Sequence, residues 1–188
     1  MKLRWIPNAI CLVRIALVPL VVLSLLDQRY GVALGLFVIA GGSDGLDGFL
    51  AKRFGWQTRL GSLLDPLADK TLVSATFITL AWLELVPLGL VVIVVARDVV
   101  IVAGAFAYQF LVAPVQGLPS VISKLNTGFQ LTFVVCVIAN AAYGWPSAML
   151  LIALGAACVF TAIVSGLNYV LKWSALALSH ARRHGQPT

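Results

Sequence analysis

Charged side chains are scarce in this sequence. Only 11% of its 188 residues are Asp, Glu, Lys or Arg, whereas 61% are hydrophobic. A soluble domain carries about a quarter charged residues, because it needs polar groups to cover its surface in water. The shortage excludes a soluble enzyme and a disordered chain, and it excludes a nucleic-acid binder despite a formal net charge of +6. We expect a polytopic membrane protein whose basic residues face the cytoplasm.

Cysteine and histidine are also rare. The three cysteines, Cys11, Cys136 and Cys158, lie within apolar runs, with no CxxC or Cys/His spacing. Cysteines in such surroundings are typically small buried hydrophobes. We therefore expect neither a disulfide framework nor a metal site built on cysteine.

Six long apolar segments make up most of the chain. A membrane-spanning helix needs about 20 largely apolar residues, and a span must be helical or part of a barrel because lipid offers the backbone no hydrogen-bond partner. No segment shows the period-2 alternation of a barrel strand. We predict an all-α membrane protein with six transmembrane helices in a single domain, residues 1–188. The predicted spans are 8–26, 31–51, 61–84, 87–112, 122–142 and 146–171.

Most of the basic residues fall on one side of these spans. They precede the first span, fill the second-to-third connection, open the fifth span and follow the sixth (Lys2, Arg4, Lys52, Arg53, Arg59, Lys124, Arg182 and Arg183). This asymmetry predicts that both termini lie in the cytoplasm. The first apolar run lacks a small-residue cleavage site, so we expect a retained helix rather than a signal peptide. The expected location is a bacterial cytoplasmic (inner) membrane.

Acidic residues occur where a membrane disfavours them. Five of the seven lie in the interior of the predicted spans rather than at a span end or between spans (Asp44, Asp47, Asp65, Asp69 and Asp98). An ionised carboxylate in a bilayer is costly and normally marks a functional site. The spacings of three (44 and 47) and four (65 and 69) place each pair on one helical face. The two pairs lie in neighbouring antiparallel spans near their cytoplasmic ends, so we expect the four carboxylates to converge. Two hard divalent cations, Mg²⁺ or Mn²⁺, would relieve their repulsion, since all-oxygen ligands suit these metals.

Two other interpretations of the acids stay open. They could form buried ion pairs with Lys52, Lys70 and Arg97, which would account for one or two of them. They could instead serve a cation or proton transporter, which would make the chain a non-enzyme. Glycines in the same region favour a bulky ligand that approaches the backbone closely. They are Gly41, Gly42, Gly45, Gly48 and Gly61.

The segment from Asp44 to Asp69 resembles the CDP-alcohol phosphatidyltransferase signature, D-x2-D-G-x2-A-R-x8-G-x3-D-x3-D. All four aspartates, both glycines and the alanine match at the required spacings. The one departure is Lys52 in place of the usual arginine, which keeps the positive charge but loses the bidentate fork. Ile6-Pro7-Asn8 followed by Arg14 is similar to the family's N-terminal I-P-N-x5-R element.

This resemblance implies a six-helix membrane enzyme, usually a homodimer, that transfers a phosphatidyl group from CDP-diacylglycerol to an alcohol and releases CMP. It implies that the four aspartates (Asp44, Asp47, Asp65 and Asp69) hold two divalent cations, and that Asp69 also acts as general base. It further implies binding of the cytidine diphosphate part by Asn8, Arg14, Gly48, Lys52, Thr58 and Gly61.

The alcohol acceptor is suggested by three further segments. Ala-Asp-Lys70, Arg97-Asp98-Val99 and the run from Ser123 to Gln130 look most like the eukaryotic-type cardiolipin synthases, with phosphatidylglycerophosphate synthases as close relatives. A dianionic glycerol 3-phosphate should require several cationic partners, and the candidates are only Arg97 and Lys124. We therefore expect phosphatidylglycerol as the acceptor and cardiolipin as the product, with glycerol 3-phosphate as the alternative. Arg97 could instead be only the partner of Asp98.

Overall fold

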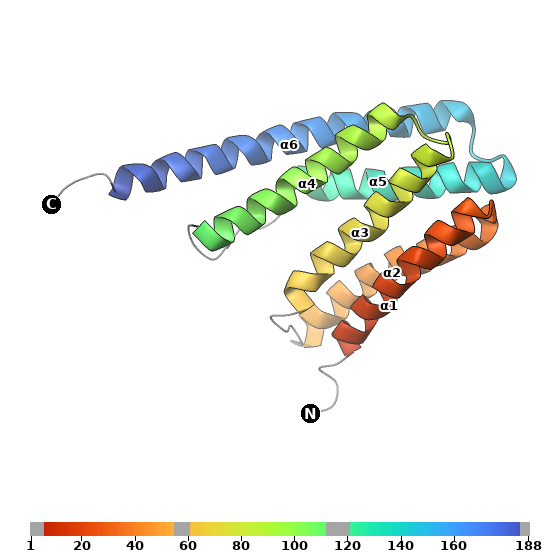
Figure 1. Cartoon of the computed structure of the whole chain (residues 1–188), viewed down its shortest axis with the longest axis horizontal. Helices are drawn as coiled ribbons and strands as arrows, with labels where there is room; N and C mark the ends of the chain where they lie inside the picture. The colour runs from red at the N-terminus through yellow and green to blue at the C-terminus, as the bar shows by residue number, and fades with distance from the viewer. Residues whose placement is uncertain (1–5, 55–60, 112–120, 185–188) are drawn as a thin grey trace.

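A computed structural model of the chain describes residues 6–54, 61–111 and 121–184. Within these ranges it describes the side chains of residues 13–42, 70–104 and 122–169. All regular structure in the described residues is helical, as predicted (Figure 1). The helices are α1 (Ile6–Leu26), α2 (Tyr30–Phe54), α3 (Gly61–Trp82), α4 (Leu88–Leu111), α5 (Val121–Tyr143) and α6 (Ala148–His184).

These six helices correspond one to one with the six predicted segments, and most ends agree within three residues. The exception is α6, which continues from the predicted end at 171 to His184. Hydropathy set the predicted end, but residues 172–184 are rich in Ala and Leu, which favour a helix whether or not lipid surrounds it. The 37 residues of α6 span roughly 55 Å at 1.5 Å per residue, so the helix is longer than a bilayer's hydrocarbon core.

Three tight turns join the helices in pairs at one end of the bundle, on the right in Figure 1. Each turn contains a residue with positive φ just after a helix end: Gln28 (57°), Glu84 (58°) and Gly144 (70°). Such a left-handed residue lets the next amides bond back to the last helical carbonyls. The Arg29 amide bonds to the Ser24 carbonyl at 2.8 Å, for example. The pairs α1–α2, α3–α4 and α5–α6 are therefore antiparallel hairpins.

The helices form two halves, α1–α2–α3 and α4–α5–α6. Helix α1 packs on both α2 and α3, and α6 packs on both α4 and α5. The halves meet mainly where α2 packs on α5, whereas α3 makes few contacts with α4, α5 or α2. Fully buried apolar side chains fill the core, and the Phe77 and Phe133 rings stack with their centroids 6.1 Å apart.

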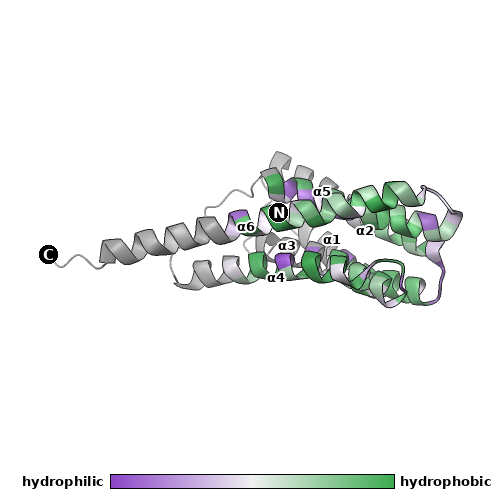
Figure 2. Ribbon diagram, turned by 90° about the horizontal axis from the view of Figure 1, so that it is seen from above, coloured by the Kyte–Doolittle hydropathy of each residue, from purple (hydrophilic) through white to green (hydrophobic). Residues whose placement is uncertain are grey.

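The outer surface of the bundle is apolar. Large hydrophobic side chains such as Trp82, Met149 and Ile152 are more than 70% exposed, and Figure 2 shows hydrophobic residues along most of the coloured helices. In the described part of the chain, Ile122–Tyr143 and Ala148–Tyr169 are long and apolar enough to cross a membrane. That all six helices cross it stays a prediction.

Two of the three cysteines can be assessed. Cys158 is buried and Cys136 is half-buried, and both are free thiols. This agrees with their interpretation as small buried hydrophobes. The side chain of Cys11 lies outside the described residues.

Candidate functional site

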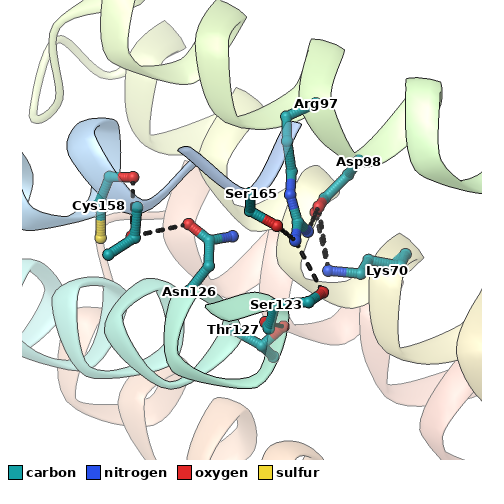
Figure 3. Close-up of polar contacts among 9 residues, drawn as sticks. Lys70, Arg97, Asp98, Ser123, Asn126, Thr127, Cys158 and Ser165 are labelled. Atoms are coloured by element: carbon teal, nitrogen blue, oxygen red, sulfur yellow. Dashed lines mark hydrogen bonds and ion pairs between the residues drawn. The ribbon is translucent and has the colours of Figure 1, made fainter. Parts of the chain in front are cut away.

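A buried carboxylate on α4 forms the centre of a charged cluster. Asp98 is only 3% exposed, and its Oδ1 accepts a hydrogen bond of 2.6 Å from Arg97 Nη1 (Figure 3). Lys70 Nζ on α3 lies 3.1 Å from both carboxylate oxygens of Asp98. Two cations thus compensate one anion, which makes its burial among apolar helices possible.

Arg97 extends this cluster to two further helices. Its Nη2 donates to the hydroxyl of Ser123 on α5 at 2.8 Å and to the hydroxyl of Ser165 on α6. The planar guanidinium suits this arrangement because it presents several donors in fixed directions. Lys70, Asp98, Arg97, Ser123 and Ser165, which we call the polar network, therefore join α3, α4, α5 and α6.

Helix α5 contributes a polar face to the same interior. Ser123, Asn126, Thr127 and Gln130 follow one another at spacings of three, one and three residues, which places them on one side of a helix. The Oδ1 of Asn126 accepts a 2.9 Å hydrogen bond from the hydroxyl of Thr161 on α6. Asn126 and Gln130 are both completely buried. Among the described residues, neither amide atom of Gln130 has a hydrogen-bond partner.

A cavity of about 270 Å³ lies between α3 and α4 beside the polar network. The lining includes Lys70 and Asp98 together with Thr71, Ser74, Val99, Val102 and Ala103. There is space for this cavity because α3 and α4 make few direct contacts with each other.

Comparison with known proteins identifies the family. The family model of CDP-alcohol phosphatidyltransferase matches residues 4–179, nearly the whole chain. The chain belongs to this family. The resemblance found in the aspartate signature is thereby confirmed.

Several curated relatives are similar in sequence. A cardiolipin synthase (CMP-forming) from Rattus norvegicus is 34% identical over 180 residues, covering 87% of this chain and 60% of the relative. The human protein of the same name is 32% identical over the same shares. A CDP-diacylglycerol–glycerol-3-phosphate 3-phosphatidyltransferase from Bacillus subtilis is 33% identical, covering 93% of this chain and 98% of the relative. The chain thus spans about 60% of the length of the two cardiolipin synthases.

The family's signature residues lie where two helices approach their shared connection. Asp44 and Asp47 belong to the second half of α2, and Asp65 and Asp69 belong to the first turns of α3. Their side chains lie outside the described residues, so their convergence stays a prediction. In the side chains that the structure does describe, no group of three or more His, Cys, Asp or Glu could hold a metal ion. As a donor set, four carboxylates fit Mg²⁺ or Mn²⁺, which prefer oxygen ligands.

The other predicted site residues are placed as follows. Arg14 is buried on α1, at 2% exposure. Asn8 belongs to α1, Gly48 and Lys52 belong to α2, and Gly61 belongs to α3. The side-chain surroundings of these four residues lie outside the described part of the structure, and Thr58 lies outside it altogether. Their contacts with the nucleotide stay predictions.

The two predicted acceptor ligands differ in their surroundings. Lys124 is exposed on α5, directly after Ser123. Arg97 is only 6% exposed and bonds to Asp98, as one of the two interpretations of the sequence required. The buried ion pairs considered for Lys70 and Arg97 therefore exist, but their partner is Asp98. Whether Arg97 or Lys124 also contacts the acceptor stays a prediction.

Thr161 and Ser165 are polar-network and interior residues that the sequence analysis missed. They lie four residues apart in Ala148–Tyr169, the more apolar of the two described segments that are long enough to cross a membrane. That spacing places both hydroxyls on one face of α6. Two hydroxyls on one face of an apolar helix are the signal that could have identified them.

Proposed function

We propose that this chain is a phosphatidyltransferase of phospholipid biosynthesis that makes cardiolipin and CMP from CDP-diacylglycerol and phosphatidylglycerol. The observation that carries the proposal is the match to the CDP-alcohol phosphatidyltransferase family over residues 4–179, with the complete set of four signature aspartates. The similarity to two cardiolipin synthases (CMP-forming) supports the acceptor.

In the proposed reaction, the free hydroxyl oxygen of the acceptor attacks the phosphatidyl phosphorus of CDP-diacylglycerol. The bond from that phosphorus to the CMP oxygen breaks, and CMP leaves with the electron pair. Asp69 takes the proton of the attacking hydroxyl. A carboxylate suffices as base because the hydroxyl is held in line with the leaving group, which lowers the demand on basicity.

The remaining site residues bind and orient the nucleotide in this proposal. Asp44, Asp47, Asp65 and Asp69 would hold two divalent cations, which when bound neutralise charge on the pyrophosphate. Asn8, Arg14, Lys52 and Thr58 contact its phosphates. Gly48 and Gly61 leave room for the cytidine, since glycine allows close approach to the backbone.

The polar network supports phosphatidylglycerol over glycerol 3-phosphate as acceptor. Lys70 and Arg97, the two cations of α3 and α4, share the single carboxylate of Asp98, so the three groups together keep one net positive charge. A phosphodiester carries one negative charge and needs fewer cationic partners than a dianionic phosphate. The apolar surface of the bundle also suits an acceptor with acyl chains.

Glycerol 3-phosphate is the second candidate acceptor. The Bacillus subtilis relative, named for that substrate, matches over 98% of its own length, whereas the two cardiolipin synthases match over 60% of theirs. With this acceptor the product would be phosphatidylglycerophosphate.

The proposal includes an integral membrane protein with six spans and both termini on the cytoplasmic side of a bacterial inner membrane. The basic residues at the corresponding ends of the helices support this orientation. A homodimer is expected for the family and is part of the proposal.

The test is an acceptor comparison with the full chain purified in nanodiscs. CDP-diacylglycerol and Mn²⁺ or Mg²⁺ are supplied with either phosphatidylglycerol or glycerol 3-phosphate, and CMP and the lipid product are quantified by mass spectrometry. CMP with cardiolipin supports the leading proposal. Turnover of glycerol 3-phosphate alone contradicts the acceptor but not the reaction class. Cation flux in proteoliposomes without CMP release would establish the transporter alternative.

A further inference from the structure

Helix α3 carries two of the signature aspartates but has few direct contacts that fix its position. It packs well on α1, whereas its contacts with α2, α4 and α5 are sparse. Helix α2, which carries the other two aspartates, is held differently, because it packs on both α1 and α5. The relative position of the two carboxylate-bearing helices therefore depends on more than their own contact.

The Lys70–Asp98 pair supplies a second attachment for α3. Lys70 directly follows Asp69 in the chain, and its Nζ lies 3.1 Å from both oxygens of Asp98 on α4. A donor equidistant from both oxygens fixes the Lys70 side chain along the axis of the carboxylate. The attachment thus acts within one residue of the predicted general base.

The rest of the polar network connects this attachment to α2. Arg97 holds the same carboxylate at 2.6 Å and donates to Ser123 on α5. Helix α5 in turn packs on α2. A continuous path therefore runs from α3 through α4 and α5 to α2, opposite the shared packing of both helices on α1.

The charges of Lys70 and Asp98 indicate that the pair fixes the alignment of α3 with α4 and does not only stabilise their contact. Asp98 is 3% and Lys70 is 20% exposed. Two apolar side chains would join α3 and α4 at a lower desolvation cost than two charges do. A charge pair depends on the alignment of the helices more strongly than an apolar contact does, and fixing register is the best-attested use of buried ionic groups.

We propose that Lys70 and Asp98 are positioning residues that set α3 in register with α2, so that the four signature carboxylates can hold divalent cations. This inference rests on the proposed function for the identity of the cluster. The pair does not touch substrate in this proposal and acts only through the placement of Asp65 and Asp69.

The principal test is Lys70→Met in the full chain in nanodiscs. This change leaves the Arg97–Asp98 pair in place and keeps the apolar stem of the side chain, so we expect a folded protein. Mn²⁺ binding is measured directly by electron paramagnetic resonance of the free ion. We expect Mn²⁺ affinity to fall by about tenfold or more, the usual effect of losing a group that orients metal ligands. Lys70→Arg, which keeps the charge and the reach to Asp98, should restore affinity to within about threefold of the original protein.

Thr76→Val is the matched control on the same helix. Thr76 is completely buried, and its hydroxyl donates only to the Leu72 carbonyl of α3 itself. This substitution removes a buried polar atom without touching the attachment to α4, so Mn²⁺ affinity should stay unchanged. In the CMP-release assay, Lys70→Met should raise the Mn²⁺ concentration for half-maximal rate and leave the KM for phosphatidylglycerol unchanged. A general loss of structure would not change the Mn²⁺ dependence of the rate while leaving the KM for phosphatidylglycerol unchanged.

The outcomes separate this inference from the proposed function. Mn²⁺ affinity of Lys70→Met within twofold of the original, or failure of Lys70→Arg to restore it, overturns the positioning role. An original protein that binds Mn²⁺ but releases no CMP with either acceptor overturns the proposed function alone. If the original protein binds no Mn²⁺, the positioning role is tested instead by hydrogen exchange of the metal-free protein. Lost protection of α3 peptides up to Ser74 in Lys70→Met supports the attachment, and unchanged protection refutes it. Should Lys70→Met aggregate, Lys70→Leu, which likewise removes the donor to Asp98, replaces it in every comparison.

Discussion

Replacing Arg97 tests how far the polar network stabilises the bundle. Arg97→Met removes the 2.6 Å bond to Asp98 and the donors to Ser123 and Ser165. Breaking a buried ion pair by removing one partner costs about 3–5 kcal/mol. Lys70 still compensates Asp98 at 3.1 Å, so we expect a loss at the lower end, about 3 kcal/mol. Ser165 adds little, because its hydroxyl can bond instead to the carbonyl four residues earlier in α6.

Arg97→Lys separates the charge from the geometry of the guanidinium. A single ammonium keeps the positive charge but does not reproduce the fork that reaches three helices at once. We expect a loss of about 1.5–2 kcal/mol, the lower end of the value of one hydrogen bond to a charged group. The free energy of unfolding is measured by titrating SDS into mixed micelles and following helix content by circular dichroism.

Lys124→Met is the control for these two variants. Lys124 is exposed on α5, and such a surface substitution should change the free energy of unfolding by less than about 0.5 kcal/mol. A loss below about 1 kcal/mol for Arg97→Met would contradict the reasoning, which rests on the cost of leaving a buried carboxylate short of a partner. Equal losses for Arg97→Lys and Arg97→Met would show that the charge of Arg97 contributes nothing.

Three further substitutions test separate features. Asp69→Asn should abolish CMP release while elution volume and helix content stay unchanged, and any retained turnover at the original rate would remove its role as base. Gly155→Leu should destabilise the bundle by about 1–3 kcal/mol through overpacking. A Cβ at this position would lie 3.2 Å from a leucine methyl of α4 and 3.3 Å from a phenylalanine ring of α5. Gly35→Leu, at a position with no atom within 4 Å, is its control in the same SDS titration. Gln130→Leu should be neutral or stabilising, since neither of its amide atoms has a partner in the described structure. Asn126→Leu should lower the free energy of unfolding by about 1 kcal/mol more than Gln130→Leu does, because it loses the hydrogen bond from a threonine of α6. A larger loss for Gln130→Leu than for Asn126→Leu would refute this comparison.

The helices were predictable from sequence because lipid imposes a simple requirement. Apolar runs of about 20 residues must be helical in a bilayer, and the breaks between them are short and rich in glycine, proline or charge. The end of α6 was not predictable in this way, since hydropathy reports where lipid could be and not where the hydrogen-bonded helix stops. Residues 172–184 stay helical after the apolar run has ended.

The candidate site was predictable where it depends on spacing within one helix. The two aspartate pairs and the polar face of α5 can all be read from intervals of three and four residues. The polar network was less predictable. Arg97 and Asp98 are adjacent and point about 100° apart on a helix, yet the long arginine side chain bends back to the carboxylate. The contacts of Arg97 with Ser123 and Ser165 join residues 26 and 68 positions away, and they depend on how α4, α5 and α6 pack.

The Arg97–Asp98 pair also bears on how the chain enters a membrane. Both charges belong to one helix and already contact each other at 2.6 Å. In the proposed six-span topology, helix α4 would therefore leave the translocon with its two charges neutralising each other, before α3, α5 or α6 has arrived. A lone Arg or Asp at the centre of a helix costs about 2.5–3.5 kcal/mol on insertion scales, and pairing within the helix lowers that barrier. The Lys70–Asp98 pair, in contrast, joins two helices, so it forms only once α3 and α4 have packed together.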